Sequence, residues 1–158
     1  MSASLFELIK PGMVQQLGSH TFTADEIIAF AQKYDPQPFH LSQEGGEQSH
    51  FGALCACGWH TASMWMRCNV EKRDSEILKS TGYTGPKPEY GPSPGIRNVR
   101  WLLPVFVGDT ISYSTEITGK RKTPHRPGWG MVFSKNLAHN QHGKLVMDMQ
   151  GAVTMRTD

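Results

Sequence analysis

The chain has 158 residues, of which 16 are basic and 14 acidic, so its formal net charge at neutral pH is +2. This length fits one domain with a sizeable core, and we expect residues 1–158 to form it. Charges of both signs are spread along the sequence, so we expect no nucleic acid and no membrane as partner, and any anionic partner should be small.

The three cysteines form no CxxC pair and no zinc-site spacing with histidine, so we expect free thiols in a reducing compartment and no metal. The amino-terminal segment MSASLFELIKPGM has no basic region followed by a long apolar run, and no apolar stretch approaches the ~20 residues of a membrane-spanning helix. We therefore expect a cytoplasmic protein. Residues 84–95, which are dense in proline and glycine, are interpreted as a long loop inside the domain.

The first predicted helix follows a capping box, in which Thr23 offers its hydroxyl to the first turn and Glu26 can bond back. Apolar residues at helical spacing extend it over residues 24–33. It then runs into an Asp-Pro turn.

The heptapeptide YDPQPFH after this helix places an acid, Asp35, and an imidazole, His40, five residues apart. Pro36 and Pro38 fix their own φ and bias each preceding residue towards extended geometry, which stiffens the turn. A stiff loop is a good mount for general acid–base groups. On the residues alone a second interpretation stays open, in which Asp35 closes the helix and His40 is a packed loop histidine.

A buried helix is predicted over residues 57–70, because CGWHTASMWMRCNV has small or apolar side chains on nearly every side. The polar, glycine-broken segment before it, residues 41–51, predicts a small irregular helix or a loop. Charged residues reappear at Arg67 and from Glu71 onward, so we expect this helix to emerge into solvent. His60 is expected to be buried and bonded to a backbone carbonyl.

Beyond Gly95 the pattern changes to four strand-like runs separated by turns, at residues 96–107, 109–122, 129–139 and 144–155. One buried helix followed by about four antiparallel strands indicates an α+β fold, in which a sheet wraps around a single long apolar helix.

Taken in this order, several segments resemble the MaoC-like dehydratases of the hot-dog fold, a family that includes the (R)-specific enoyl-CoA hydratases. The resemblance covers roughly residues 18–155 and rests on HTFTADEIIAFAQKYDPQPFH, FGALCACGWHTA, GPSPGI, RWLLPVFVGDT and RPGWG. It implies a five-stranded antiparallel sheet curled around a long central helix, with subunits paired in at least a dimer, for which a homodimer is expected.

The resemblance also implies that Asp35 and His40 are catalytic and that the backbone N–H of Gly58 receives the thioester oxygen. Gly58 lies at the start of the predicted buried helix, where unpaired N–H groups and the helix dipole favour an oxyanion, and its missing side chain permits close approach. A packing glycine between helix and sheet is the alternative. Some hydratases carry a serine eight residues further on, where this chain has Met66; Ser63 is the nearest hydroxyl on the helix.

The implied reaction is the reversible hydration of a trans-2-enoyl-CoA to an (R)-3-hydroxyacyl-CoA, with no cofactor apart from the coenzyme A of the substrate. Candidate substrate-binding residues are Phe39, Phe51 and Trp59, with Arg97 and Arg126 for the phosphates of coenzyme A. Two other functions stay open: an acyl-CoA thioesterase of the same fold, and a non-catalytic subunit that binds acyl thioesters. The acyl-chain length and the choice between coenzyme A and acyl carrier protein are open as well.

Overall fold

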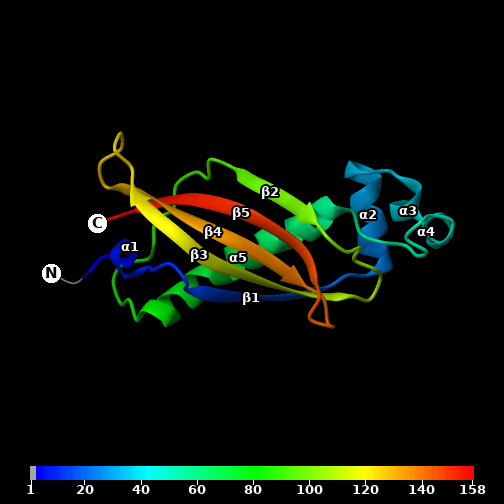
Figure 1. Cartoon of the computed structure of the whole chain (residues 1–158), viewed down its shortest axis with the longest axis horizontal. Helices are drawn as coiled ribbons and strands as arrows, with labels where there is room; N and C mark the ends of the chain where they lie inside the picture. The colour runs from blue at the N-terminus through cyan, green and yellow to red at the C-terminus, as the bar shows by residue number, and fades with distance from the viewer. Residues whose placement is uncertain (1–2) are drawn as a thin grey trace.

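One antiparallel sheet curves around a single long helix (Figure 1). The structure is a computed structural model and describes residues 3–158. The sheet has the order β1-β3-β4-β5-β2 and consists of β1 (Val14–Thr21), β2 (Ile96–Trp101), β3 (Thr110–Lys122), β4 (Trp129–His139) and β5 (Leu145–Arg156). The helices are α1 (Leu5–Leu8), α2 (Ala24–Tyr34), α3 (Pro38–Leu41), α4 (Gln43–Glu47) and α5 (Gly58–Thr81). This arrangement confirms the predicted hot-dog fold.

The short helices lie at opposite ends of the sheet. α2, α3 and α4 gather at one end, beside the start of α5, whereas α1 and the carboxyl terminus lie at the other end (Figure 1). Residues 35–40 and the start of α5 therefore share one end of the molecule. Within residues 3–158 no helix is both long enough and apolar enough to cross a membrane.

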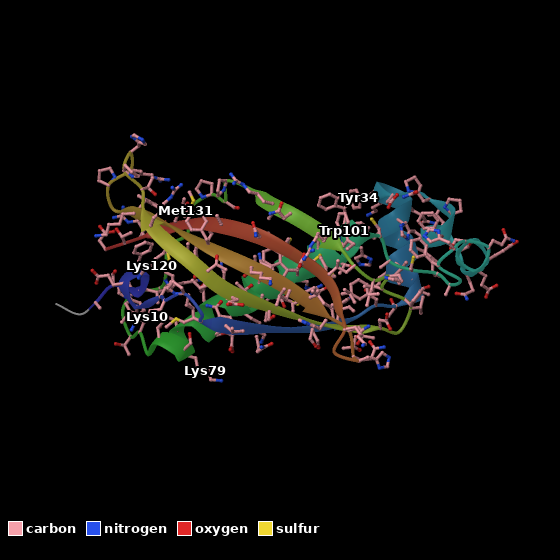
Figure 2. The ribbon with its side chains drawn as sticks, viewed as in Figure 1. Lys10, Tyr34, Lys79, Trp101, Lys120 and Met131 are labelled. Carbon is pink, nitrogen blue, oxygen red and sulfur yellow. The ribbon has the colours of Figure 1, made fainter. Side chains whose placement is uncertain are left out.

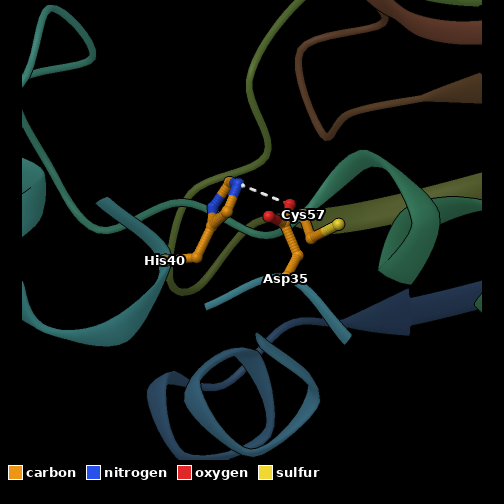
Figure 3. A group of neighbouring side chains, drawn as sticks. All are labelled: Asp35, His40 and Cys57. Carbon is orange, nitrogen blue, oxygen red and sulfur yellow. Dashed lines mark ion pairs between the residues drawn. The ribbon is translucent and has the colours of Figure 1, made fainter. Parts of the chain in front are cut away.

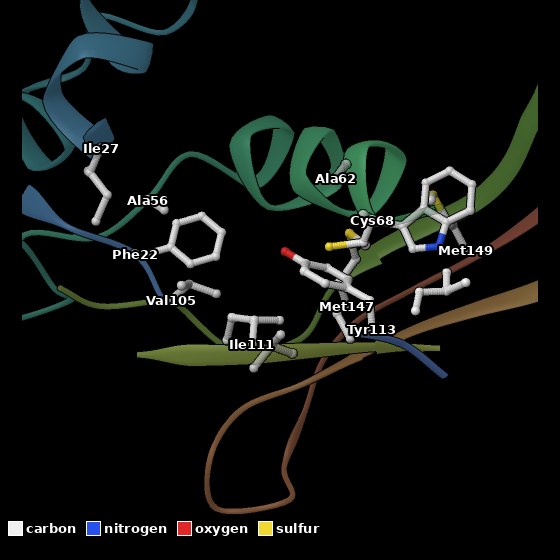
Figure 4. Close-up of a cluster of buried hydrophobic side chains, with 14 of the residues drawn as sticks. Phe22, Ile27, Ala56, Ala62, Cys68, Val105, Ile111, Tyr113, Met147 and Met149 are labelled. Carbon is white, nitrogen blue, oxygen red and sulfur yellow. The ribbon is translucent and has the colours of Figure 1, made fainter. Parts of the chain in front are cut away.

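Tyr113 ties the long helix to the middle of the sheet. Its side chain is fully buried on β3, and its phenol donates a hydrogen bond of 2.9 Å to the backbone carbonyl of Thr61 on α5 (Figure 4). Phe22, Ile111 and Met147 pack in the same buried cluster. Because burial of large apolar side chains dominates folding stability, this cluster fixes α5 on the sheet and sets where its first turn lies.

The central helix is longer than predicted, since α5 continues to Thr81 instead of ending near Val70. The charged residues after Val70 lie largely on its outer side, and Ile77 then returns to a second buried cluster with Leu5 and Phe6 of α1. Gly82, at φ +66°, ends the helix in the left-handed conformation that glycine adopts without penalty.

Strand β1 and helix α1 were not predicted from the residue pattern. The two buried side chains of β1 are Gln15 and Leu17, so the polar Gln15 hides the alternation by which a strand is recognised. Helix α1 is a single turn capped by Ser4, too short for periodicity to show. The resemblance, by contrast, did imply the fifth strand.

The strand predicted over residues 96–107 is also shorter, because β2 ends at Trp101. Its pairing with β5 shifts register between Arg97 and Arg100, and Leu102 then donates its N–H to the carbonyl of Val146 as the chain turns away. The proline- and glycine-rich segment 84–95 connects α5 to this strand and runs beside β5, where Gly91 donates to Thr154.

His60 should make the stability of the fold depend on pH. Its ring is buried and stacked on Phe30 with 4.6 Å between centroids, its Nε2 faces Glu26 Oε1 at 3.8 Å, and its Nδ1 has no partner among residues 3–158. The ring thus faces a carboxylate, and the predicted bond to a backbone carbonyl is wrong. Burial lowers the pKa of His60 below 6.5. The charge of Glu26 acts in the opposite direction and raises it, and His20 makes a smaller contribution that lowers it.

A folded-state pKa below the unfolded value means that, in the window between them, the unfolded chain binds a proton that the folded chain does not. The free energy of unfolding should therefore fall as the pH drops from 6.5 towards the folded-state pKa. Urea titrations across this window should show the loss in the wild type and a weaker loss in His60→Phe. His142→Phe, which alters an exposed turn, is the control and should retain the wild-type slope.

Candidate active site

The carboxylate of Asp35 is mounted at the end of α2. Asp35 is the C-cap of this helix, at φ −155° and ψ 71°, and Gln37 is extended at φ −87° and ψ 142°, as the two prolines predicted. The side-chain amide of Gln37 donates to Asp35 Oδ1 at 2.7 Å. Pro38 then opens the one-turn helix α3, so His40 lies on a short helix and not on a loop.

His40 is buried, and its ring is hydrogen-bonded to Cys55. Its Nδ1 lies 2.6 Å from the carbonyl oxygen of Cys55, and since a carbonyl only accepts, Nδ1 carries the hydrogen. The other nitrogen, Nε2, faces Asp35 Oδ2 at 3.4 Å (Figure 3). The tautomer is therefore fixed, and Nε2 is the atom that can exchange a proton with a bound molecule.

A third residue, Cys57, completes the group. Its Sγ, a carboxylate oxygen of Asp35 and a ring nitrogen of His40 all lie within 4.8 Å of one another (Figure 3). Burial alone would raise the pKa of Asp35, but the Cys57 thiol, the Gln37 amide and the charge of His40 together lower it. Asp35 is therefore ionised at neutral pH.

Sequence reasoning missed Cys57 as a member of the site. The available signal was its position directly before Gly58, which makes it the N-cap of α5. Burial and the neighbouring Asp35 raise the pKa of its thiol, so the sulfur is protonated at neutral pH.

A carboxylate, an imidazole and a thiol are also a donor set that can hold a metal ion such as zinc. A metal takes the thiolate, and the raised pKa of Cys57 works against that form. The expectation of no metal stays a prediction.

A cavity of about 260 Å³ opens beside His40. It runs between the first turn of α5 and the chain that follows β2, and its walls are mostly apolar. Its lining consists of His40, Phe51, Cys55, Ala56, Gly58, Thr61, Trp101, Leu102, Leu103, Pro104, Val105 and Val146. Low polarity around an imidazole that lines a cavity strengthens its electrostatic interactions with a bound molecule.

Gly58 is the first residue of α5, as predicted, and the helix start points its free N–H groups towards this end of the molecule. The indole of Trp101 rests on its α-carbon: a Cβ built at Gly58 would lie only 2.5–2.9 Å from three atoms of that ring. Gly58 is thus a close-packing position between helix and sheet and also a residue of the cavity wall. The packing interpretation drawn from the sequence is confirmed, and the role of its N–H in oxyanion binding stays a prediction.

The other predicted site residues are three aromatic residues and two arginines, and the aromatic residues lie near His40 or the start of α5. Phe39 packs edge-on against His40 at 4.6 Å and near Phe51 at 5.2 Å between ring centroids, and Phe51 lines the cavity; substrate binding by both stays a prediction. Trp59 is about half exposed and meets Trp101 edge-on at 5.0 Å. Trp101 lies at the end of β2 nearer to α2 (Figure 2).

Neither predicted arginine is brought to the cavity within this chain. Arg97 lies exposed on β2 and is absent from the lining of the cavity. Arg126 lies in the β3–β4 turn, at the end of the sheet opposite α2, stacked 3.9 Å above the Trp129 ring (Figure 1). Ser63 donates its hydroxyl to the carbonyl of Trp59 at 2.7 Å and is exposed, so it does not replace the serine that some relatives carry at Met66.

The arrangement suits proton transfer to and from one small molecule. An ionised carboxylate and an imidazole Nε2 with fixed tautomer face each other, and a water beside them could hydrogen-bond to both. The start of α5, directly after Cys57, adds backbone donors near this pair, where they would stabilise negative charge.

The chain is similar to a known protein family and to several solved structures. The sequence profile of the family described as MaoC like domain matches residues 9–127. A MaoC-like dehydratase from Rhodospirillum rubrum has a solved structure that is 29% identical, with a TM-score of 0.77 over 96% of each chain. A monoamine oxidase regulatory protein from Archaeoglobus fulgidus is 28% identical, with a TM-score of 0.78 over 97% of this chain and 94% of that one.

A more distant likeness is to an (R)-hydratase from A. caviae involved in PHA biosynthesis, at 23% identity and a TM-score of 0.65, covering 92% of this chain and 96% of that one. At this identity the likeness shows the fold alone. A search among curated proteins gave no significant match.

Proposed function

Because the chain belongs to the family of MaoC-like domains, we propose that it is a hydratase that adds water reversibly to a trans-2-enoyl-CoA, giving an (R)-3-hydroxyacyl-CoA. The observation that carries this proposal is the pair formed by Asp35 and His40, with 3.4 Å between Oδ2 and Nε2, of which His40 lines an apolar cavity. Neither nucleophilic attack by a side chain nor a redox step is required.

In the proposed reaction a water that is hydrogen-bonded to both Asp35 and His40 attacks the β-carbon of the enoyl thioester. One of its protons goes to the carboxylate or to Nε2, the C=C π-pair moves towards the thioester, and the α-carbon then takes up a proton from the same pair of residues. Water is added across the double bond, and no other atom is gained or lost. General acid–base groups held at this range contribute about 10²–10⁴-fold to such steps.

The thioester oxygen gains negative charge as the water attacks. The N–H of Gly58, at the first position of α5, is the donor that we assign to it. The acyl chain then occupies the apolar cavity between Phe51 and Val146. Coenzyme A forms part of the substrate, and no other cofactor is proposed.

Parallel assays separate this function from the thioesterase and from the non-catalytic subunit. Purified protein is supplied with straight and branched enoyl-CoA thioesters, and loss of the conjugated-thioester absorbance and release of free thiol are followed together. Hydration removes absorbance without releasing thiol. Thiol release would identify a thioesterase, and binding without either signal across the panel would identify a binding subunit.

A second copy of the chain is the proposed partner. Trp59, Met66 and Val70 form an exposed apolar row along α5, and Ile96 and Trp101 are exposed on β2. β2 is an edge strand, paired only with β5 within residues 3–158. An edge strand beside an apolar helix face is a surface that two copies can share about a two-fold axis, antiparallel strand against strand.

Sedimentation velocity should therefore find a dimer, and Val70→Glu should shift it towards the monomer because the new carboxylate would be buried at the interface. Lys79→Glu places the same charge at the far end of α5 (Figure 2) and should leave the dimer intact. A monomeric wild type would remove the basis of this assignment.

Cys57 should influence how the reaction depends on pH. Its thiol helps to lower the pKa of Asp35, so Cys57→Ala should raise that pKa and move the acid limb of the kcat/KM profile for crotonyl-CoA to higher pH. Cys57→Ser keeps a hydroxyl donor and should restore part of the shift. Cys68→Ala, a buried cysteine further along α5, is the control and should leave the limb in place. An unmoved limb in Cys57→Ala would contradict the role.

A further inference from the structure

A second cavity lies between α5 and the sheet, and three of its polar groups have no partner among residues 3–158. It has a volume of about 130 Å³ and is lined by Trp65 and Asn69 of α5, Gln15 of β1, Thr115 of β3, Asn136 of β4 and Gly151 of β5, among others. We call it the inner cavity. It shares no residue with the cavity beside His40.

Three buried N–H donors that line the inner cavity lack an acceptor within residues 3–158. They are Nε2 of Gln15, Nε1 of Trp65 and Nδ2 of Asn136, on side chains that are 3%, 7% and 0% exposed. Buried donors are nearly always satisfied in folded proteins, because an unmade hydrogen bond leaves the desolvation of the group uncompensated. All three groups are donors, so the missing partner is an acceptor.

The neighbours of Asn136 fix which of its atoms is free. Thr115 donates its hydroxyl to Asn136 Oδ1 at 2.9 Å, which leaves the NH₂ group for another partner. A Cβ at Gly151 would lie 3.0 Å from that nitrogen. The glycine therefore keeps the space beside the amide open.

The rest of the lining defines the chemistry of the occupant. Aliphatic side chains surround the donors, among them Ile77, Ile117 and Val153. The lining contains no aspartate or glutamate, and its one charged residue is Arg73. An apolar chain that carries an oxygen acceptor, such as a keto or carboxylate group, fits both the aliphatic walls and the three donors.

The position of the inner cavity relates this occupant to the proposed substrate. Thr61 lines the cavity beside His40, and Trp65, one helical turn further along α5, lines the inner cavity. Trp65 is seven residues beyond Gly58, a rise of roughly 10 Å along the helix. This is about the reach of a medium-length acyl chain whose thioester carbonyl lies at Gly58.

We propose that the inner cavity receives the distal part of the acyl chain, and that the preferred substrates are medium-chain enoyl thioesters with an oxygen acceptor near the end of the chain. This inference rests on the proposed hydratase function. It assigns Gln15, Trp65 and Asn136 to the recognition of that oxygen.

The experiment compares trans-2-decenoyl-CoA with its analogue that carries a ketone near the chain end. The wild type should have a kcat/KM at least about tenfold higher for the keto substrate, the size of effect expected for satisfying buried donors. Gln15→Met keeps the side-chain length without the donor and should reduce this ratio severalfold. Gln16→Met, on the exposed neighbour, should keep the wild-type ratio.

Because the ratio of kcat/KM for the two substrates is measured within one variant, any general loss of activity or folding cancels. A wild-type ratio near one, or one unchanged in Gln15→Met, would mean that the cavity holds only water and would overturn the inference. If crotonyl-CoA and both longer substrates are not turned over at all, the hydratase proposal fails instead. The inner cavity is then tested by calorimetry with saturated decanoyl-CoA and its keto analogue, where tighter binding of the keto ligand supports the inference and equal binding rejects it.

Discussion

Asp35→Asn should reduce the turnover of crotonyl-CoA by about 10²–10⁴-fold, the range that a positioned general acid–base group contributes. Asparagine has nearly the same shape and can still accept the hydrogen bond that Gln37 donates, but its amide does not take up a proton from water. His40→Gln should lose a similar factor, since it removes the Nε2 that faces Asp35 and the bond to the Cys55 carbonyl. Steady-state kinetics by absorbance at several pH values measure both.

The matched controls for these variants make the same chemical changes away from the cavity. Asp25→Asn alters an exposed carboxylate in the first turn of α2, and His142→Gln alters an exposed histidine in the β4–β5 turn. Both should retain wild-type turnover. Near wild-type turnover in either Asp35→Asn or His40→Gln, with an active parent enzyme, would refute the catalytic assignment.

Gly58→Ala should be the most damaging single methyl addition in the site. The new Cβ would lie 2.5–2.9 Å from three atoms of the Trp101 indole, so the ring must move, and Trp101 forms part of the cavity wall. Overpacking of this kind costs about 1–3 kcal/mol of stability. Displacement of the wall should also lower kcat/KM by about 10²-fold, as misplacements of about 1 Å do.

Because alanine keeps the backbone N–H, this variant separates packing from oxyanion binding. Adding Trp101→Ala makes room for the methyl group, so the double variant should regain stability relative to Gly58→Ala, as thermal unfolding would show. Gly119→Ala is the control, since the nearest atom to its new Cβ would be 3.9 Å away. If Gly58→Ala were as stable and as active as Gly119→Ala, the close contact with Trp101 would have no consequence for the site.

The contact between Asp35 and His40 could be predicted from the sequence because its determinants are local. Two prolines, the helix before them and the five-residue spacing lie within one short segment, and the structure places Asp35 and His40 in contact as that segment predicts. The helix start at Gly58 was also local, since a glycine precedes a run of small and apolar residues. The family resemblance then assigned roles to these three residues.

The parts that sequence reasoning missed depend on packing between distant segments. Trp101 reaches Gly58 only because β2 lies beside the start of α5, and no pattern near either residue records that contact. The fixed tautomer of His40 depends on the carbonyl of Cys55, and backbone groups carry no sequence signal. Arg126 was predicted to bind the phosphates of coenzyme A on the basis of its charge alone. It lies in the turn of the β3–β4 hairpin, far from the cavity.

The strand order has a consequence for how the protein reaches its active form. β3, β4 and β5 follow one another along the chain, but the two edge strands are drawn from earlier segments: Val14 pairs with Glu116, and Ile96 pairs with Gly151. Contacts at such separations form slowly, because a long loop must close before they are made. Asp35, His40 and α5 leave the ribosome before β3 to β5 exist, while Val146, on the last strand, completes the cavity wall. Catalytic competence should therefore appear only after the carboxyl-terminal strand has been synthesised and has joined the sheet.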